Sequence, residues 1–293
     1  MNHAVHPESS MELVLVGAGR VGTAVAELLR RRGHRVAGVS SRTPESASRA
    51  AQLLDSPTFE LFDLPRCDLV LLGVADAAVE PVAARLASQL GADTVVCHFA
   101  GSLGLEPLRS VVEVGAGACA MHPVQAVPDV AAGLARLPGS AWGLTCSSGL
   151  SWWAEALVTL ELHGTPVQVA EAARRVWHAA SVTMSNGIAA LIATGESMLE
   201  SIGVAEPTAV LGPLADGTVA NAAERGGAAA LTGPMVRGET VTVAHHLQAL
   251  RSGAPDLAHS YALVAELVLA AARRAGRVDR EIEHAIGVLL TAR

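Results

Sequence analysis

The chain has 293 residues, which is long for one domain and comfortable for two. All 21 of its basic side chains are arginine, so any mechanism that needs a lysine as acid, base or Schiff-base nucleophile is excluded. The net charge of −7 argues against nucleic-acid binding, for which a basic patch would be needed.

Several kinds of segment are not predicted. Residues 1–10 lack the apolar core of a signal peptide and are expected to form a disordered leader, with Met11 an alternative start. The best apolar candidate, residues 261–272, is too short to cross a bilayer and contains Glu266, so no membrane span is expected. The cysteines lie far apart without C-x-x-C spacing, which predicts free thiols in a reducing cytoplasm and no metal site.

Residues 11–168 alternate between strand and helix patterns. Apolar runs predict strands at 11–17, 34–40, 68–74, 93–100, 118–122 and 140–146. Helical spacing predicts helices at 21–32, 44–54 and 77–90. Because continuous apolar strands alternate with helices, we expect an α/β Rossmann domain with a parallel sheet covered on both faces.

Strand patterns disappear in residues 169–293. One long helix is predicted over 171–202, a helix with a glycine break over 207–221, and further helices over 238–250, 257–275 and 279–292. The second domain is therefore predicted to be all-helical and to begin at residue 169.

A G-x-G-x-x-G motif lies between the first predicted strand and helix, which is the context of a dinucleotide-binding loop. The first glycine permits the tight turn, the second permits approach to a pyrophosphate, and the third permits close helix packing. A glycine turn without a ligand is the alternative. The expected cofactor contacts are Gly17, Ala18, Gly19, Arg20, Val21 and Gly22.

The end of the second strand predicts the choice of cofactor. An NAD enzyme usually places a carboxylate there, but this chain has Ser40, Ser41 and Arg42. Two hydroxyls and a guanidinium suit a 2′-phosphate, so we predict NADP(H). The alternative for Arg42 is a solvated loop residue.

Four segments carry a resemblance to a known family: residues 98–104 (HFAGSLG), 122–129 (HPVQAVPD), 177–186 (WHAASVTMSN) and 231–239 (LTGPMVRGE). With the glycine loop, they resemble the 6-phosphogluconate-dehydrogenase-like reductases, and within them the "Rossmann-like plus DUF2520" proteins. Relatives include ketopantoate reductases, pyrroline-5-carboxylate reductases and prephenate dehydrogenases. The resemblance implies a homodimer interlocked through the helical domains, with substrate between the nicotinamide and the long helix.

The resemblance also implies further cofactor contacts at strand ends, namely Val74, Ala75, Asp76 and Gly101. Many relatives use a lysine four residues before an asparagine on the long helix. If Asn186 is that asparagine, the lysine position is Val182, so another group must take over the lysine's role.

Candidate groups lie on the long helix and at a strand end. His178, Ser181, Ser185 and Asn186 share one helix face, which predicts His178 as the acid, Asn186 as an orienting residue and Ser185 as a substrate contact. A structural histidine and solvent-facing polar residues are the alternative.

The segment after the fifth predicted strand resembles the HP-x-x segment of prephenate dehydrogenases. It predicts His122 as a substrate contact or rival acid and Gln125 as a substrate contact, the alternative being a buried histidine in a turn. Ser102 and Arg237 are further candidate substrate contacts, and an ordinary surface arginine is the alternative for Arg237.

Together these features predict an NADPH-dependent reductase of a small carbonyl compound. Ketopantoate-type 2-oxo acids are the first expected substrates, on the resemblance alone. Reduction of a cyclic imine is a second enzymatic hypothesis, because a protonated imine demands less of an acid. A non-catalytic NADP(H)-binding sensor is a third, although it has no evident need for the polar face of the long helix.

Overall fold

The structure is a computed structural model that describes residues 9–291. It contains two compact units that divide between Ser185 and Asn186, and each is described by itself. Most of the leader expected at residues 1–10 lies outside the described residues.

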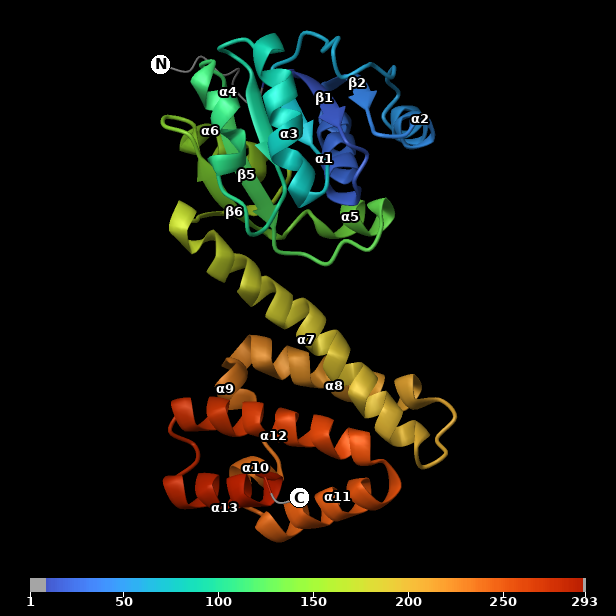
Figure 1. The fold of residues 1–293 in the computed structure, drawn as a ribbon, viewed down its shortest axis with the longest axis vertical. Helices are drawn as coiled ribbons and strands as arrows, with labels where there is room; N and C mark the ends of the chain where they lie inside the picture. Colours follow the sequence, from blue (N-terminus) through green and yellow to red (C-terminus); the bar gives the residue numbers. More distant parts are fainter. Residues whose placement is uncertain (1–8, 292–293) are drawn as a thin grey trace. The chain divides into compact units, whose positions relative to one another are not determined.

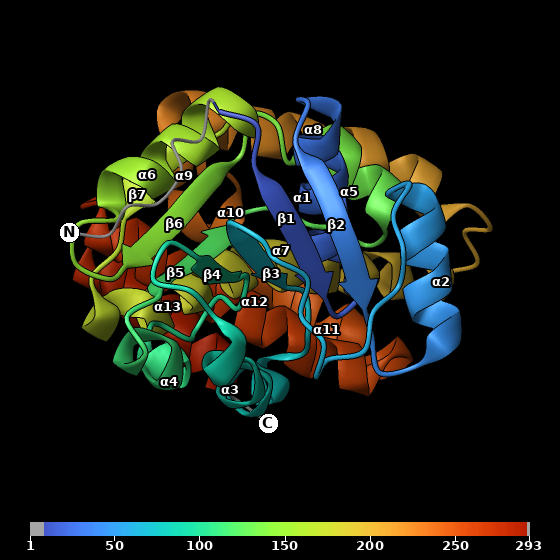
Figure 2. The ribbon, with the colours of Figure 1, turned by 90° about the horizontal axis from the view of Figure 1, so that it is seen from above.

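Within the described residues, the first unit contains one seven-stranded sheet in the order β2-β1-β3-β4-β5-β6-β7 (Figures 1 and 2). The strands are β1 (Glu12–Val16), β2 (Arg35–Ser40), β3 (Leu69–Leu72), β4 (Val95–His98), β5 (Gly117–Pro123), β6 (Ala141–Cys146) and β7 (Thr165–Gln168). The first five are mutually parallel, so their carboxyl ends lie at one edge of the sheet.

Both faces of the sheet are buried, as the continuous apolar strands predict. Leu13 and Leu15 face one core, whereas the intervening Val14 and Val16 face the other, in the two-residue period of a strand. The first core is covered by α1 (Arg20–Arg31), α2 (Pro44–Leu53), α5 (Val130–Arg136) and α6 (Ser151–Ala156). The second is covered by α3 (Asp76–Leu86) and the short α4 (Arg109–Glu113). The Rossmann prediction is confirmed.

The strand order reverses between β1 and β3. The chain goes outward from β1 to β2 and then returns across β1 to β3. Beyond β2 there is a single parallel bridge between Val39 and Thr58, where a further edge strand of a classical nucleotide fold would lie. In open α/β sheets ligands bind at such a reversal, outside the carboxyl ends of the strands.

Two strands differ from the prediction of a wholly parallel sheet. β6 is antiparallel to β5, because the chain re-enters the sheet where β5 ends and Pro123 pairs with Trp142. β7 was not predicted; it lies just before residue 169, where we expected the second domain to begin, and it forms the half-exposed edge of the sheet. A strand buried on both faces shows the same apolar pattern whether it runs parallel or antiparallel to its neighbour, so the sequence does not reveal its direction.

The second unit is helical in its described residues. It contains the later turns of α7 (Arg174–Glu200), followed by α8 (Pro207–Arg225), α9 (Gly227–Ala230), α10 (Pro234–Arg237), α11 (Thr240–Gly253), α12 (Pro255–Arg274) and α13 (Arg280–Thr291). Its core joins α10 to α13 through residues such as Val243, Ala265 and Ile286. The glycine break expected in α8 is absent, because Gly212 and Gly217 are accommodated within one continuous helix.

The long helix is apolar and poorly covered in the single chain. Val176 and Met184 on α7 are 72% and 62% exposed. The segment Glu171–Glu200 is long and apolar enough to cross a membrane by length and composition, contrary to the expectation that no segment would be. One such helix is weak evidence for a span, because helices of soluble proteins pass the same test.

Three cysteines form a row across neighbouring strands. Cys97 on β4 pairs with Cys119 on β5, which in turn pairs with Cys146 on β6. All are free thiols, and Cys146 is the half-buried one. Burial, together with hydrogen bonds to Cys146 and Cys97, raises the pKa of Cys119 well above its usual value.

Candidate active site

The glycine loop connects β1 to α1 at the carboxyl edge of the sheet. Gly17 has a φ of +89°, which side chains other than glycine rarely adopt, and its N–H donates to the carbonyl oxygen of Ser40 at 2.7 Å. Gly19 begins α1 without any side-chain cap. The first N–H groups of the helix are therefore available to an anion, as a pyrophosphate site requires.

A fourth glycine, Gly73 at the end of β3, makes the loop compact. The Gly19 N–H donates to the Gly73 carbonyl at 2.9 Å, and a Cβ on Gly19 would lie 2.3 Å from that oxygen. A Cβ on Gly22 would lie 2.7 Å from the Gly73 Cα. The motif is thus packed against the strand on the other side of the sheet reversal, a requirement that the motif alone does not reveal.

The end of β2 has the polar character expected for NADP(H). Ser40 is buried and fixes the glycine loop, Ser41 is half-buried, and Arg42 is exposed. Among the described residues Arg42 has no hydrogen bond or ion pair in the structure. The hydroxyl of Thr43 accepts a hydrogen bond from the Ser46 N–H and caps α2. At the end of β3, Val74 is half-buried, and Ala75 and Asp76 lie exposed where α3 begins.

The loop after β4 is fixed by a buried histidine, His98. Its Nδ1 accepts from the Ala100 N–H at 3.2 Å, so its Nε2–H donates to the Gly104 carbonyl at 2.8 Å. Burial is the main cause that lowers the pKa of His98, which favours this neutral form. The loop carries Gly101 and Ser102 to the carboxyl edge of the sheet.

Arg174 anchors the first turn of α7 to this edge. It is 1% exposed, and its guanidinium donates to main-chain carbonyls of three neighbouring segments. These are Ala100 at 2.7 Å and Leu103 at 2.9 Å after β4, Ala120 at 3.5 Å on β5, and Gly143 at 2.9 Å on β6. No carboxylate among the described residues forms a hydrogen bond or ion pair with Arg174, although the charge of Glu171 acts on it and opposes the lowering of its pKa by burial. The buried guanidinium lies beneath the site.

His122 and His178 meet at this edge, one from β5 and the other from α7. Their rings are edge to face, with centroids 5.3 Å apart. The indole N–H of Trp177 donates to His122 Nδ1 at 3.1 Å. Burial first, and then the charges of His178 and Arg174, lower the pKa of His122 to about 4. His122 is therefore a neutral imidazole at pH 7.

His178 packs against Gly101. A Cβ at Gly101 would lie 2.0 Å from His178 Nδ1, so only glycine leaves room for the ring. That Nδ1 is buried and has no hydrogen-bond partner. A buried N–H without an acceptor would cost about 1–3 kcal/mol, which favours the tautomer with the proton on Nε2.

The other sequence-predicted contacts lie apart from the two histidines. The Gln125 side chain binds its own loop, with its oxygen accepting from the Ala126 N–H at 2.9 Å. Ser181 donates back to the Trp177 carbonyl. Ser185 and Asn186 are exposed on α7. Asn186 follows His178 by eight residues, about 12 Å along a helix, so it lies about two turns further along α7.

Arg237 lies in the second unit at the end of α10. Its Nε is 2.6 Å from a carboxylate oxygen of Glu239, and the arginine side chain is 58% exposed. Gly233 and Gly238 flank this short helix, both with positive φ.

Sequence reasoning missed the residues that assemble the site, namely Gly73, Gly143, Arg174 and Trp177. Gly143 makes room for Trp177, because a Cβ there would lie 2.6 Å from the indole. The adjacent Trp177-His178 pair, so early on a helix otherwise rich in small residues, was the available signal. Nothing in the sequence marks Arg174 as buried, since arginine side chains are usually solvated.

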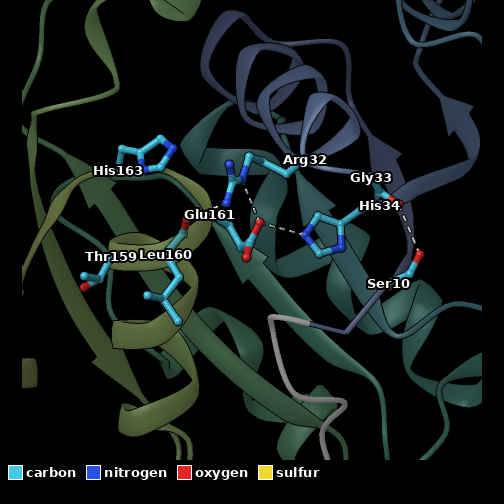
Figure 3. A pocket seen from close by; sticks show the side chains of 8 residues that line it. All are labelled: Ser10, Arg32, Gly33, His34, Thr159, Leu160, Glu161 and His163. Carbon is cyan, nitrogen blue, oxygen red and sulfur yellow. Dashed lines mark hydrogen bonds and ion pairs between the residues drawn. The ribbon is translucent and has the colours of Figure 1, made fainter.

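A cavity of about 620 Å³ lies beside the starts of β1 and β2, at the opposite ends of these strands from the glycine loop (Figure 3). Its charged groups bind one another, since Glu161 lies 3.3 Å from both Arg32 and His34. The His163 side chain has no partner among the residues drawn in Figure 3. We assign no ligand to this cavity.

Comparison with known proteins places the chain among Rossmann-containing proteins. A Rossmann-like domain model matches residues 3–123, and a model described as a domain of unknown function, DUF2520, matches residues 141–268. No functionally curated protein matches the sequence.

Solved structures share the fold at low identity. A Bacteroides fragilis protein described as a "putative NADP oxidoreductase" is 24% identical, with a TM-score of 0.73 over 90% of this chain and 99% of its own. A reductive aminase from Aspergillus terreus, solved with NADPH, is 18% identical, with a TM-score of 0.68 over 96% of this chain and 99% of its own. A 1-pyrroline-5-carboxylate reductase from Streptococcus pyogenes is 17% identical, with a TM-score of 0.59 over 94% of this chain and 98% of its own.

The two domain matches follow one another along the chain, and the structural neighbours cover both units, as the resemblance of the four motifs predicts. The chain thus carries a match to a Rossmann-like domain followed by a match to a DUF2520 domain.

Proposed function

We propose that this protein is an NADP(H)-dependent oxidoreductase that reduces a small carbonyl compound. The observation that carries the proposal is the placement of a glycine loop and a pair of histidines at one edge of one sheet. The loop follows β1, His122 lies near the carboxyl end of β5, and His178 of α7 packs against Gly101 in the loop after β4. That edge is where open α/β sheets bind ligands.

The residues present fit the cofactor. The uncapped start of α1 and the side-chain-free surface at Gly19 suit a pyrophosphate. Ser41 and Arg42 suit the 2′-phosphate of NADPH, since no carboxylate at the end of β2 repels it. Neighbours described as an NADP oxidoreductase and as a complex with NADPH support the same assignment. NADPH bound there would supply a hydride at the histidine end of the site.

The chain's own residues then stabilise the oxygen of the acceptor. When a hydride adds to a carbonyl carbon, the π electrons of the carbonyl group move onto oxygen as a lone pair. The Nε2–H of neutral His122 and the Nε2–H of His178 can each donate to this oxygen, in the manner of an oxyanion hole. Both imidazoles keep their protons, and water supplies the proton that completes the alcohol. The two imidazole N–H donors take the place of the lysine that many relatives carry.

The electrostatics favour an acceptor that gains negative charge. The buried guanidinium of Arg174 lies beneath the site, and no carboxylate is among the groups that influence His122. Such a site would repel a cationic iminium and attract a carboxylate or a developing alkoxide. We therefore place 2-oxo acids before cyclic imines. A sensor without turnover would gain nothing from two aligned imidazoles.

The test is turnover with a substrate panel. Purified protein is mixed with NADPH and, separately, 2-oxo acids, cyclic imines and prephenate-like compounds, while the nicotinamide absorbance is followed. We expect reduction of a 2-oxo acid, faster with NADPH than with NADH, and a fall of about 10²–10³ in kcat for His178→Ala. Tight NADPH binding without turnover of any class would favour the sensor and contradict an enzyme.

A further inference from the structure

Trp177 determines which nitrogen of His122 carries the proton. Its indole N–H is only a donor, and it lies 3.1 Å from His122 Nδ1. A nitrogen that accepts a hydrogen bond is unprotonated, so the single proton of the neutral ring lies on Nε2. The hydrogen bond thus leaves His122 with an N–H donor on the side of the ring away from Trp177.

The position of Trp177 is itself fixed from two sides. Its indole lies over Gly143 on β6, where a Cβ would lie 2.6 Å from the indole nitrogen. Arg174, almost one turn earlier on α7, donates to the carbonyl of the same Gly143 at 2.9 Å. The start of the helix therefore has one register against β6, and that register brings the indole N–H to His122.

We propose that Trp177 is a positioning residue, whose indole N–H holds His122 in the Nε2–H tautomer so that this N–H is the donor offered to the acceptor oxygen. The inference rests on the proposed function for its chemical meaning. The tautomer itself is a property of the free protein. It can therefore be measured whether or not a substrate is found.

The first experiment reads the tautomer directly. Full-length protein labelled with ¹⁵N at histidine is studied by long-range proton–nitrogen correlation near pH 7, with His122 assigned through His122→Gln. We expect one protonated Nε2 and one unprotonated Nδ1. In Trp177→Phe, which keeps an aromatic ring but lacks the donor, the tautomer ratio should shift about threefold to tenfold toward Nδ1–H. Trp152→Phe, at a 47% exposed position on α6, is the matched control and should leave the His122 tautomer ratio unchanged.

A second variant guards against a packing defect in Trp177→Phe. β-(3-Benzothienyl)alanine at position 177 keeps the shape of the indole and replaces the N–H by sulfur. It should give the same tautomer shift with an unchanged unfolding midpoint. A wild-type His122 protonated on Nδ1, or a tautomer ratio unchanged in this variant, would overturn the proposal.

Kinetics separate this inference from the function on which it rests. With a substrate in hand, both Trp177 variants should lower kcat in proportion to the lost Nε2–H population, while the KM for NADPH stays constant. An unchanged kcat despite a shifted tautomer would overturn the role of Trp177 in the reaction. Absence of wild-type turnover would instead defeat the proposed function and leave the tautomer result standing.

Discussion

At the scale of single residues, the site depends on keeping the His122 imidazole neutral. His122 is surrounded by donors and positive charge, namely the Trp177 N–H, His178 and buried Arg174. The indole N–H favours an unprotonated Nδ1, and the positive charge favours the neutral ring. Protonation would place a second cation beside Arg174 and break the bond to Trp177. His122 is thus better suited to donate a hydrogen bond than to transfer a proton at pH 7, in the way that a neutral histidine can act as an electrophile.

This environment predicts how stability depends on pH. The pKa of His122 is about 4 in the folded chain and near 6.5 when unfolded, so the unfolded state binds more protons between these values. Its contribution is present above pH 6.5, and the free energy of unfolding should fall as pH drops from 6.5 toward 4. The loss from His122 is at most about 3 kcal/mol.

Urea denaturation at several pH values measures the effect. His122→Gln should flatten this dependence but not abolish it, because buried His98 also has a lowered pKa and acts with the same sign. His245→Gln, at an exposed position on α11, is the control and should keep the wild-type slope. A His122→Gln slope equal to that of the wild type would contradict the assignment.

At the scale of elements, the nucleotide loop depends on a strand that the motif does not include. A Cβ at Gly73 would lie 2.4 Å from the Gly17 carbonyl oxygen, and the contacting atoms are backbone, which cannot move aside cheaply. Gly73→Ala should therefore displace the loop. We expect a loss of stability of about 1–3 kcal/mol and at least tenfold weaker NADPH binding.

The matched control is Gly91→Ala. A Cβ at Gly91 would meet nothing closer than the Thr94 hydroxyl at 3.7 Å, an ordinary contact. Chemical denaturation and titration of NADPH fluorescence are compared for the two variants. If Gly73→Ala bound NADPH as tightly as Gly91→Ala does, the packing of the loop on β3 would not matter for the cofactor.

The elements could be predicted from the sequence to the extent that they are local. The five parallel strands and α1 to α3 follow from apolar runs and helical spacing, and the NADP(H) prediction at Ser40–Arg42 agrees with neighbours described by that cofactor. The strand β6 was predicted at 140–146, but its antiparallel direction and the edge strand β7 could not be, because they depend on where the chain re-enters the sheet.

The site could be predicted only in part for a related reason. His122 and His178 are each visible as candidates, but their contact joins residues far apart in sequence and depends on Gly101, Gly143 and Arg174. Contacts between residues so distant in sequence leave no periodic pattern in the sequence. The roles assigned to Ser102, Gln125, Asn186 and Arg237 remain predictions.

At the scale of the whole molecule, α7 is too apolar to remain exposed to water. Val176, Met184 and Leu191 follow one another at intervals of eight and seven residues, and each is at least 45% exposed. That spacing gives one stripe along the helix, as a helix–helix contact requires. A second copy of the chain is the partner we propose, in keeping with the homodimer implied by the motif resemblance.

Analytical ultracentrifugation tests this proposal. The wild type should sediment as a dimer at micromolar concentration, and Leu191→Arg should shift it toward monomer. Val112→Asp changes an equally exposed apolar residue (44%, against 45% for Leu191), but on α4 in the Rossmann unit. It should stay dimeric. A wild-type monomer, or loss of the dimer in the Val112 variant alone, would show that α7 is not the contact.

The thiols of Cys97, Cys119 and Cys146 allow local opening of the sheet to be followed through their rates of chemical modification. Cys146 is half-buried on β6, whereas its two neighbours are fully buried. A thiol reagent in excess should therefore modify Cys146 first, and the two others only after β6 has separated from β5. The lag between these events would measure the free energy of that opening, at the histidine-bearing strand and without any engineered probe.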